Sequence, residues 1–355
     1  MMKKFKNPLS FQVDYDRKSI FRLATDEEKE EQSFMRPSTS FLGDAIRRFR
    51  RNKIAVVSFF FILVVLLAIF IIPAVYPYGY EQQLGVSAGA SVDQSFNLLP
   101  PFTYSETEKV RIAAGEFIWP HIFGTDASGR DYFIRVIYGA RVSLIVGFFA
   151  AVVVLIIGTI YGSISAFSGG KVDMVMMRIV DVIYSLPDMV IIILLSVVLN
   201  NAFEFEDTPL ENVGASLVSI FIVYALLYWV GMARLVRGQV LSIKQTEYVL
   251  ASRSIGTSTP MTIRKHIIPN CLSVIIVSAT LQVPSAIFTE SFLSFIGLGV
   301  NAPMPSLGSL ASDAVSSISD RPYLLLVPAI FICLIVLALN LMGDGLRDAF
   351  DPKQK

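Results

Sequence analysis

The sequence predicts an all-α integral membrane protein with about six transmembrane helices and both termini in the cytoplasm. Hydrophobic residues make up 54% of the 355 residues and charged residues 17%, whereas soluble globular proteins carry roughly 25% charged residues. The apolar residues are gathered into blocks close to the ~20 residues that a helix needs to cross the hydrocarbon core. The net charge of +1 gives no basic or acidic bias that would indicate nucleic acid as a partner.

The polar N-terminal segment leads into the first predicted span. Residues 1–39 are rich in charge and lack the apolar core of a signal peptide, so we expect a cytoplasmic N-terminal extension. Residues 40–53 combine an apolar helical stripe with a group of arginines, which predicts a basic interfacial helix on anionic headgroups. Residues 54–75 are expected to form the first span, and the positive charges before it place the N-terminus inside.

Residues 76–141 predict an extracellular loop, because they contain scattered Pro, Gly and Ser and no apolar run of span length. Gly124, Gly129 and Gly139 indicate a tight turn that leads to a surface helix before the second span. A calcium loop is the alternative, but the acids there are too few and lack a bidentate glutamate at the required distance. We therefore predict no metal site.

Five further spans are expected within residues 142–346, followed by a cytoplasmic tail at residues 347–355. The short loops satisfy the positive-inside rule. Pro284 interrupts the fifth span and predicts a kink there. The five spans are expected to cover about Val142–Phe167, Met174–Leu199, Ser216–Ala233, Leu272–Val300 and Leu324–Met342.

The loop at residues 240–270, between the fourth and fifth spans, is too polar to cross the bilayer but has a helical pattern. Gly256 is placed to end a first helix in the left-handed conformation. Thr259 as N-cap and Pro260 at the first helical position predict a second helix, which Pro269 stops at the membrane edge. Four residues recur at spacings of three and four and so share one face of the first helix: Tyr248, Ala251, Ser252 and Ile255.

Two interpretations of this predicted pair of short helices remain open on the residues alone. Small side chains near the bend would allow the surface of another protein to approach closely. The same pair of helices could instead be an ordinary interfacial hairpin that rests on lipid.

The loop also resembles a known motif. The run Glu247–Ser252, then Gly256, then His266–Asn270 is similar to the EAA loop of ABC-importer permeases. The resemblance implies that the loop forms a coupling helix that seats in a groove of a separate ATP-binding subunit. The site residues that it implies are Glu247, Tyr248, Leu250, Ala251, Ser252, Gly256, His266 and Pro269.

Two positions of the loop depart from the motif. Leu250 stands where the family has a glutamate, and Ser252 stands in place of its second alanine. We therefore expect docking to depend on shape and on small-residue packing around Ala251 and Gly256, and not on a charge pair.

The resemblance extends over about residues 120–352 and is closest to the dipeptide and oligopeptide (peptide/nickel) branch, especially its C-type permease subunits. Matching segments include Gly124–Asp126, Gly129–Asp131, Arg141–Leu144, Asp173, Arg178, Asp181, Pro187, Glu290–Gly299 and Asp351–Pro352. The resemblance implies a type I ABC-importer permease fold in the cell membrane. It implies as partners a homologous second permease subunit, two ATP-binding subunits that hold ATP and Mg, and an extracellular peptide-binding protein.

The chain itself shows no ATP site and no catalytic residues, and we expect it to bind no cofactor. The nearest approach to a P-loop, at residues 169–171, lacks the upstream glycine and the following hydroxyl. Energy must therefore come from another chain or from an ion gradient. A nickel or other small-solute importer is the alternative within the family, and an ion-gradient-driven secondary transporter is the alternative outside it.

Three acids lie within predicted spans, where ionisable residues are costly. Asp181 and Asp188 flank Pro187 in the third span, and Glu290 lies in the fifth. Together with Pro284 these acids are candidates for lining a peptide pathway. The alternative, which we favour for the acids, is a hydrogen bond at a helix end or between helices. Three acids without a histidine partner make a poor proton relay.

Overall fold

The computed structural model describes residues 41–86, 93–202, 215–300 and 304–350. The chain divides into a unit of residues 1–44 and a unit of residues 45–355. Helix α3 (Phe41–Phe49) begins in the first unit, and every later element lies in the second. Among the described residues, β-structure is confined to two isolated bridges, Gln83 with Arg130 and Thr125 with Asp131.

Five helices of the described chain are long and apolar enough to cross a membrane, and a bent pair, α7 with α8, would make a sixth. This confirms the predicted all-α membrane protein with about six spans. The five are α4 (Lys53–Val75), α6 (Tyr132–Ser168), the run Leu217–Ile243, the run Thr259–Phe295 and α15 (Tyr323–Phe350).

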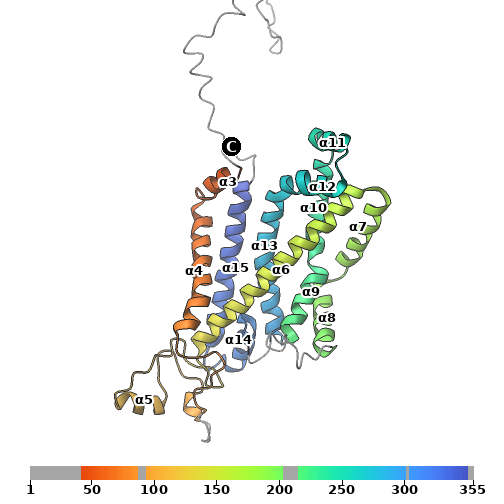
Figure 1. The fold of residues 1–355 in the computed structure, drawn as a ribbon. Helices are drawn as coiled ribbons and strands as arrows, with labels where there is room; N and C mark the ends of the chain where they lie inside the picture. The colour runs from red at the N-terminus through yellow and green to blue at the C-terminus, as the bar shows by residue number, and fades with distance from the viewer. Residues whose placement is uncertain (1–40, 87–92, 203–214, 301–303, 351–355) are drawn as a thin grey trace, which may run out of the picture. The chain divides into compact units, whose positions relative to one another are not determined.

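The shorter elements complete the bundle and its connections (Figure 1). They are α5 (Glu106–Ala113), α7 (Gly170–Tyr184), α8 (Asp188–Ala202), α9 (Ala215–Leu227), α10 (Trp229–Ile243), α11 (Glu247–Ser254), α12 (Thr259–Thr262), a π-helical turn (Ile263–Ile267), α13 (Ile268–Phe295) and α14 (Leu307–Ala314). The start of α4, the end of α15 and helices α11 and α12 lie at the same end of the bundle, which we call the elbow end.

Helix α6 is longer than predicted, since it begins at Tyr132 and not near Val142. Asp131 starts it by accepting a hydrogen bond from the backbone N–H of Ile134 at 3.1 Å. The expected separate surface helix is therefore wrong, because residues 132–141 are the first turns of α6. At 1.5 Å per residue, its 37 residues span roughly 55 Å, well beyond a hydrocarbon core of about 30 Å. Helix α6 accordingly runs obliquely past α15 and α13 (Figure 1).

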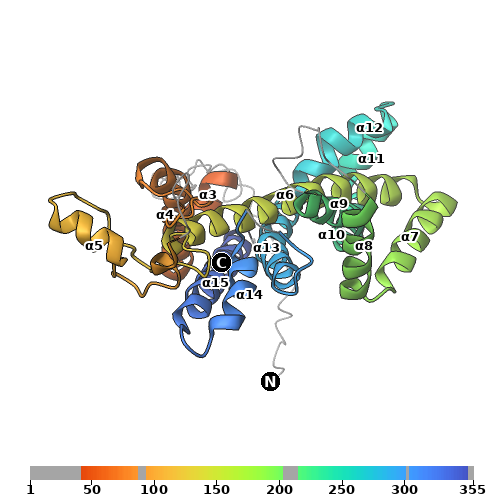
Figure 2. The ribbon, with the colours of Figure 1, turned by 90° about the horizontal axis from the view of Figure 1, so that it is seen from below.

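Helix α6 connects the two sides of the bundle. Figure 2 shows it running from the side of α4 and α15 to the side of α7 and α10, and it packs against each of these helices and against α13. Its closest approach is to α10. A Cβ atom added at Gly158 would lie 2.6 Å from Met232 Cβ, and one added at Gly162 would collide with the carbonyl oxygen of Ala233. Glycines four residues apart thus allow the two backbones to touch.

The third span is a broken helix, whereas the fourth continues through Tyr228, whose N–H still donates to Tyr224 O at 3.2 Å. The axes of α7 and α8 differ by 86° across Ser185–Pro187, so the single predicted span over Met174–Leu199 is a bent pair. Pro187 lacks the N–H that would continue a helix. Tyr228 separates α9 from α10, and α10 continues to Ile243, ten residues past the predicted end of the fourth span.

The last two spans also differ from their predicted ends. Helix α13 ends at Phe295, five residues before the predicted end, with Gly297 just beyond it in the left-handed region at φ 82°. Helix α15 continues to Phe350, so residues 347–350 of the predicted tail are helical. Residues 351–355 of the predicted tail and residues 1–39 of the predicted extension lie outside the described residues.

Candidate functional site

The segment between α10 and α13, which we call the elbow, comprises residues 244–267 and contains α11, α12 and the π-helical turn. It lies beyond the ends of α6 and α10 (Figure 1). Gly256 ends α11 as predicted, at φ 84°. The N–H of Gly256 donates to Arg253 O at 3.0 Å and that of Thr257 to Ser252 O at 3.2 Å. These two bonds form a Schellman motif, which fixes the direction in which the chain leaves α11.

The second helix of the elbow differs from the prediction at both ends. Its N-cap is Ser258, so Thr259 and Pro260 occupy the first turn. Pro269 does not stop the helix. The N–H of Ile268 donates to Ile263 O, five residues back, and Pro269 follows as the second residue of α13. The elbow is therefore joined to α13 without an intervening loop.

One face of the elbow exposes apolar side chains without a partner among the described residues. Ile255 is 83% exposed, and Tyr248, Leu250 and Met261 are between 44% and 51% exposed. Val249, in contrast, is fully buried beneath α11. We define the elbow outer face as Tyr248, Leu250, Ala251, Ile255 and Met261. Clustered exposed apolar side chains usually mark a contact surface.

Ser252 is not on this face. The structure buries it at 6% exposure, and its hydroxyl has no hydrogen-bond partner among the described residues. Sequence periodicity had placed it beside Tyr248 and Ala251, but the packing of α11 turns it inward next to Val249. The Ser252 hydroxyl therefore lies on the buried side of α11, away from the exposed apolar side chains.

Of the other predicted elbow residues, Glu247 opens α11 and is exposed, and Pro269 is exposed at the start of α13. His266 is half-buried, and its carbonyl oxygen accepts a hydrogen bond from Asn270 Nδ2 at 2.6 Å. The structure thus separates these residues into two groups, one along α11 and one around the start of α13. Their role in docking stays a prediction.

Two cations that sequence reasoning missed join the elbow to the end of α6. Lys244 Nζ donates to the carbonyl oxygens of Phe167 at 2.7 Å and Ala166 at 3.1 Å. A cation there also complements the negative end of the helix dipole. The Arg253 guanidinium lies 5.4 Å from the centre of the Phe167 ring. The sequence around Lys244 gives no local signal for these contacts, because their partners lie 77 and 78 positions away.

Glu290 is fully buried and joins α6 to α13. Its Oε2 accepts a hydrogen bond from the Ser143 hydroxyl at 2.7 Å, and its Oε1 accepts one from Ser294 at 2.7 Å. This geometry supports the interhelical role that we favoured for this acid. Pro284 is likewise buried within α13, one turn before Ile287, which lies against Gly147 of α6.

Asp181 and Asp188 bracket the bend of the third span. Asp181 Oδ1 accepts a hydrogen bond from Arg234 Nη2 at 2.7 Å, and both side chains are partly exposed. Asp188 opens α8, but its side chain lies outside the described part. A second pair joins the same two helices, because Arg237 donates to both oxygens of Asp173 at 2.6 and 2.7 Å. Helices α7 and α10 are thus held together by two ion pairs.

At the other end of the bundle, a buried histidine organises the segment between α4 and α6. His121 is fully buried, with Nδ1 2.8 Å from Asp131 Oδ2 and Nε2 3.2 Å from Glu108 Oε1. Burial disfavours the charged ring, but the hydrogen bonds to the two carboxylates outweigh it and raise the pKa of His121 to about 9. Asp131 is also the N-cap of α6 and accepts a hydrogen bond from the Tyr76 hydroxyl at 3.3 Å. The charged imidazole therefore fixes this segment to the start of α6.

Comparison with known proteins identifies the family. A family model described as binding-protein-dependent transport system inner membrane component matches residues 158–355, more than half of the chain. The chain belongs to this family. A second model, described as the N-terminal TM domain of oligopeptide transport permease C, matches residues 40–101 of this chain. The resemblance seen in the sequence is thereby confirmed.

Curated relatives match this chain over most of its length. The dipeptide transport system permease protein DppC of Bacillus subtilis is 42% identical over 94% of this chain and 92% of its own length. The oligopeptide transport system permease protein OppC of the same species is 40% identical over 95% and 97%. OppC of Escherichia coli is 41% identical over 89% and 92%.

A solved chain of the MetNI methionine ABC transporter in an inward-facing form is 17% identical, with a TM-score of 0.48, and covers 62% of this chain and 97% of its own.

Proposed function

We propose that this chain is the permease subunit of an ATP-driven importer of dipeptides or oligopeptides in the cell membrane. The names of relatives that match almost the whole chain support a peptide substrate. The chain would work with a homologous second permease, two ATP-binding subunits that hold ATP and Mg, and an extracellular peptide-binding protein. The elbow end, with the start of α4 and the end of α15, would face the cytoplasm.

The observation that carries this proposal is the elbow outer face. A short helix presents Tyr248, Leu250 and Ile255 away from the bundle, and a Schellman motif fixes its direction. Shape and apolar contact, without a charge pair, would seat this face in a groove of the ATP-binding subunit. Leu250 is 49% exposed, so the position where the family has glutamate remains available for an apolar contact.

The contacts beneath the elbow suggest how motion would leave it. Lys244 and Arg253 join the elbow to the end of α6, and Gly158 and Gly162 bring α6 against α10. Helix α6 continues to the opposite end of the bundle. A displacement of the elbow by closing ATP-binding subunits would therefore move α6 and α10 together.

Two substitutions test the docking assignment. Ala251→Trp would block close approach to the outer face, and Gly256→Pro would force φ to about −65° at a position that holds 84°. We expect each to abolish ATP-dependent uptake of a labelled peptide by the reconstituted complex, with normal membrane insertion. Lys171→Trp is the matched control, because Lys171 is exposed outside the elbow at the start of α7. Normal uptake by both elbow variants would contradict the docking role.

The same assay separates the alternatives. Nickel uptake with no peptide uptake by the wild-type complex would favour the small-solute importer. Substrate movement on a proton gradient by the purified chain alone, without any ATP-binding subunit, would establish a secondary transporter.

A further inference from the structure

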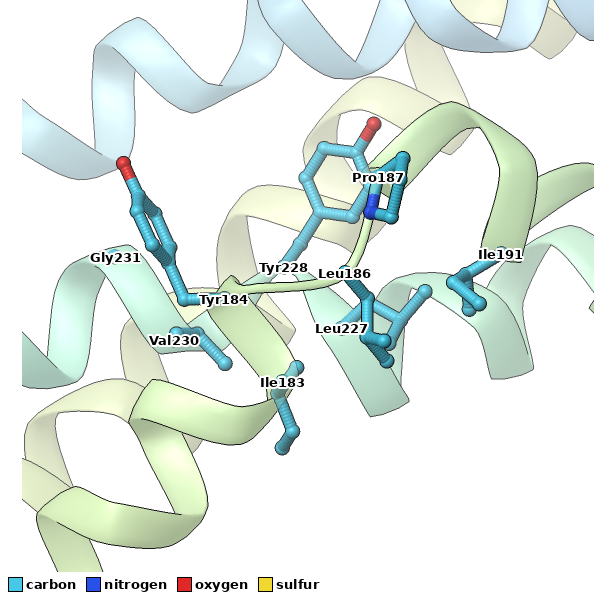
Figure 3. Close-up of a pocket in the computed structure, with 9 residues that line it drawn as sticks. All are labelled: Ile183, Tyr184, Leu186, Pro187, Ile191, Leu227, Tyr228, Val230 and Gly231. Carbon is cyan, nitrogen blue, oxygen red and sulfur yellow. The ribbon is translucent and has the colours of Figure 1, made fainter.

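The bend of the third span and the α9–α10 junction at Tyr228 lie on either side of a hollow of about 430 Å³, which we call the bend pocket. Figure 3 shows residues of both spans around it, with the Tyr184 and Tyr228 rings projecting to the same side. Its walls include Tyr184, Leu186 and Pro187 from the α7–α8 bend and Leu227, Tyr228 and Gly231 from the α9–α10 junction. The volume lies in the range of roughly 300–1,000 Å³ of small-ligand sites.

The backbone at this pocket excludes lipid as its neighbour. Ser185, Leu186 and Pro187 leave helical geometry within a span, and all three are exposed on the isolated subunit. Non-helical backbone at membrane depth is tolerated only where protein buries it or where it lines a water-filled cavity. The bend must therefore face either another subunit or an aqueous path.

The size of the pocket admits a side chain but not a whole helix. A helix is about 10–12 Å across with its side chains, too wide to enter a hollow of about 430 Å³. One apolar side chain fits such a volume and would meet Leu186, Leu227 and the two tyrosine rings. Gly231 leaves room for a guest group, because a Cβ atom added there would meet no atom within 4 Å.

A pair of opposite charges lies on the elbow side of the pocket. Asp181 and Arg234 are paired at 2.7 Å with side chains 50% and 36% exposed. The Arg234 guanidinium also lies 4.1 Å from the centre of the Tyr184 ring, which is itself part of the pocket wall. Because partly exposed ion pairs contribute little stability, this pair can open for other charged groups.

We propose that the bend pocket holds an apolar side chain of a peptide in transit, while Asp181 and Arg234 exchange their mutual contact for the peptide's terminal ammonium and carboxylate. The inference rests on the proposed function and identifies its substrate contacts. A free peptide carries one charge of each sign, which matches the two rim charges. An apolar side chain on the peptide matches the walls.

Filling the pocket from Gly231 tests the first part. We expect Gly231→Trp in the complete reconstituted complex to lower uptake of tripeptides with Leu or Phe roughly tenfold, with tri-alanine uptake changed by less than about twofold. Gly238→Trp is the matched control, since Gly238 lies on the same exposed face of α10 with open space around it and outside the pocket. We expect it to keep the wild-type ratio of Phe-peptide to tri-alanine uptake.

Asp181→Asn tests the second part. We expect this variant to lose the discrimination between free and N-acetylated peptides that the wild-type complex shows with the same binding protein. A variant Gly231→Cys, in a Cys271→Ala/Cys333→Ala background, provides a readout that does not need transport. We expect a maleimide to label it, and peptide with binding protein and ATP to slow that labelling.

The outcomes separate this inference from the proposed function. A wild-type complex that takes up no peptide defeats the proposed function, and the pocket assignment with it. Peptide uptake by the wild type, together with equal loss of all peptides in Gly231→Trp, would make the pocket a packing surface for the second permease. Unchanged selectivity in Gly231→Trp, or labelling of Gly231→Cys that peptide does not slow, would also overturn the assignment.

Discussion

At the scale of single residues, the described contacts of His121 give it a structural role outside the spans. Its imidazole lies between Asp131 and Glu108, with Tyr78 4.9 Å away ring to ring. Tyr104 and Arg111 also lie near this group of charges. Because Asp131 is the N-cap of α6, the charge on His121 supports the start of this helix.

The pKa of His121 leads to a pH prediction. Its pKa is about 9 in the folded protein against 6.5 for the free side chain, so its contribution is complete below pH 6.5 and is lost as the pH rises through about 9. The difference corresponds to on the order of 3 kcal/mol. We expect the melting temperature of the purified protein to fall between pH 6.5 and 9.5 by several degrees. In His121→Asn this fall should vanish, and a flat wild-type profile would contradict the assignment.

At the scale of elements, the contact between α6 and α10 depends on two glycines. Gly158 and Gly162 lie against Met232, Ala233 and the backbone of Arg237. Together with the ion pair of Arg237 and Asp173, this contact connects α6, α7 and α10. Close backbone approach of this kind leaves no room for a side chain.

Gly162→Leu tests this contact. Its side chain would collide with the carbonyl oxygen of Ala233, and we expect a loss of roughly 1–3 kcal/mol of stability. A melting curve in detergent measures the loss. Gly238→Leu is the matched control, because a side chain there meets open space. If the two variants melt alike, α6 and α10 are not packed as described.

At the scale of the whole molecule, the elbow and the opposite end of the bundle are linked through α6. Lys244 holds its elbow end, Ser143 contacts Glu290 of α13 midway, and Tyr132 at its other end donates a hydrogen bond to Leu324 O of α15. A helix held at three places transmits displacement better than a loop does.

We predict that removal of the contact between Lys244 and the end of α6 uncouples ATP hydrolysis from peptide uptake. We expect Lys244→Ala, in the complete complex, to hydrolyse ATP normally while peptide uptake per ATP falls roughly fivefold. The ratio is measured in proteoliposomes from phosphate release and labelled peptide. Lys171→Ala serves as the control for loss of a cation at the same end. An unchanged ratio in Lys244→Ala would show that the elbow acts without α6.

The positions of most helices could be predicted from the sequence, because the signals are local. The apolar run after Lys53 fixes α4 to within a residue, and Gly256 ends α11 through its own backbone freedom. The boundary near Val142 was wrong because the decisive signal, the capping carboxylate of Asp131, stands eleven residues before the apolar run that predicts the span. The prediction that Pro269 stops the second elbow helix was wrong because a π-helical turn leads directly into α13, which contains Pro269.

The sequence by itself determined the membrane class, the family resemblance and the elbow, since span length, charge bias and turn chemistry act within a few residues of chain. Only the tertiary structure decided what the buried ionisable side chains and the bend of the third span contact. Glu290 contacts Ser143 across 147 positions, His121 is enclosed by two carboxylates, and Pro187 and Tyr228 line one pocket. These contacts depend on how the helices pack, and packing is set by the shapes of faces that are distant in sequence.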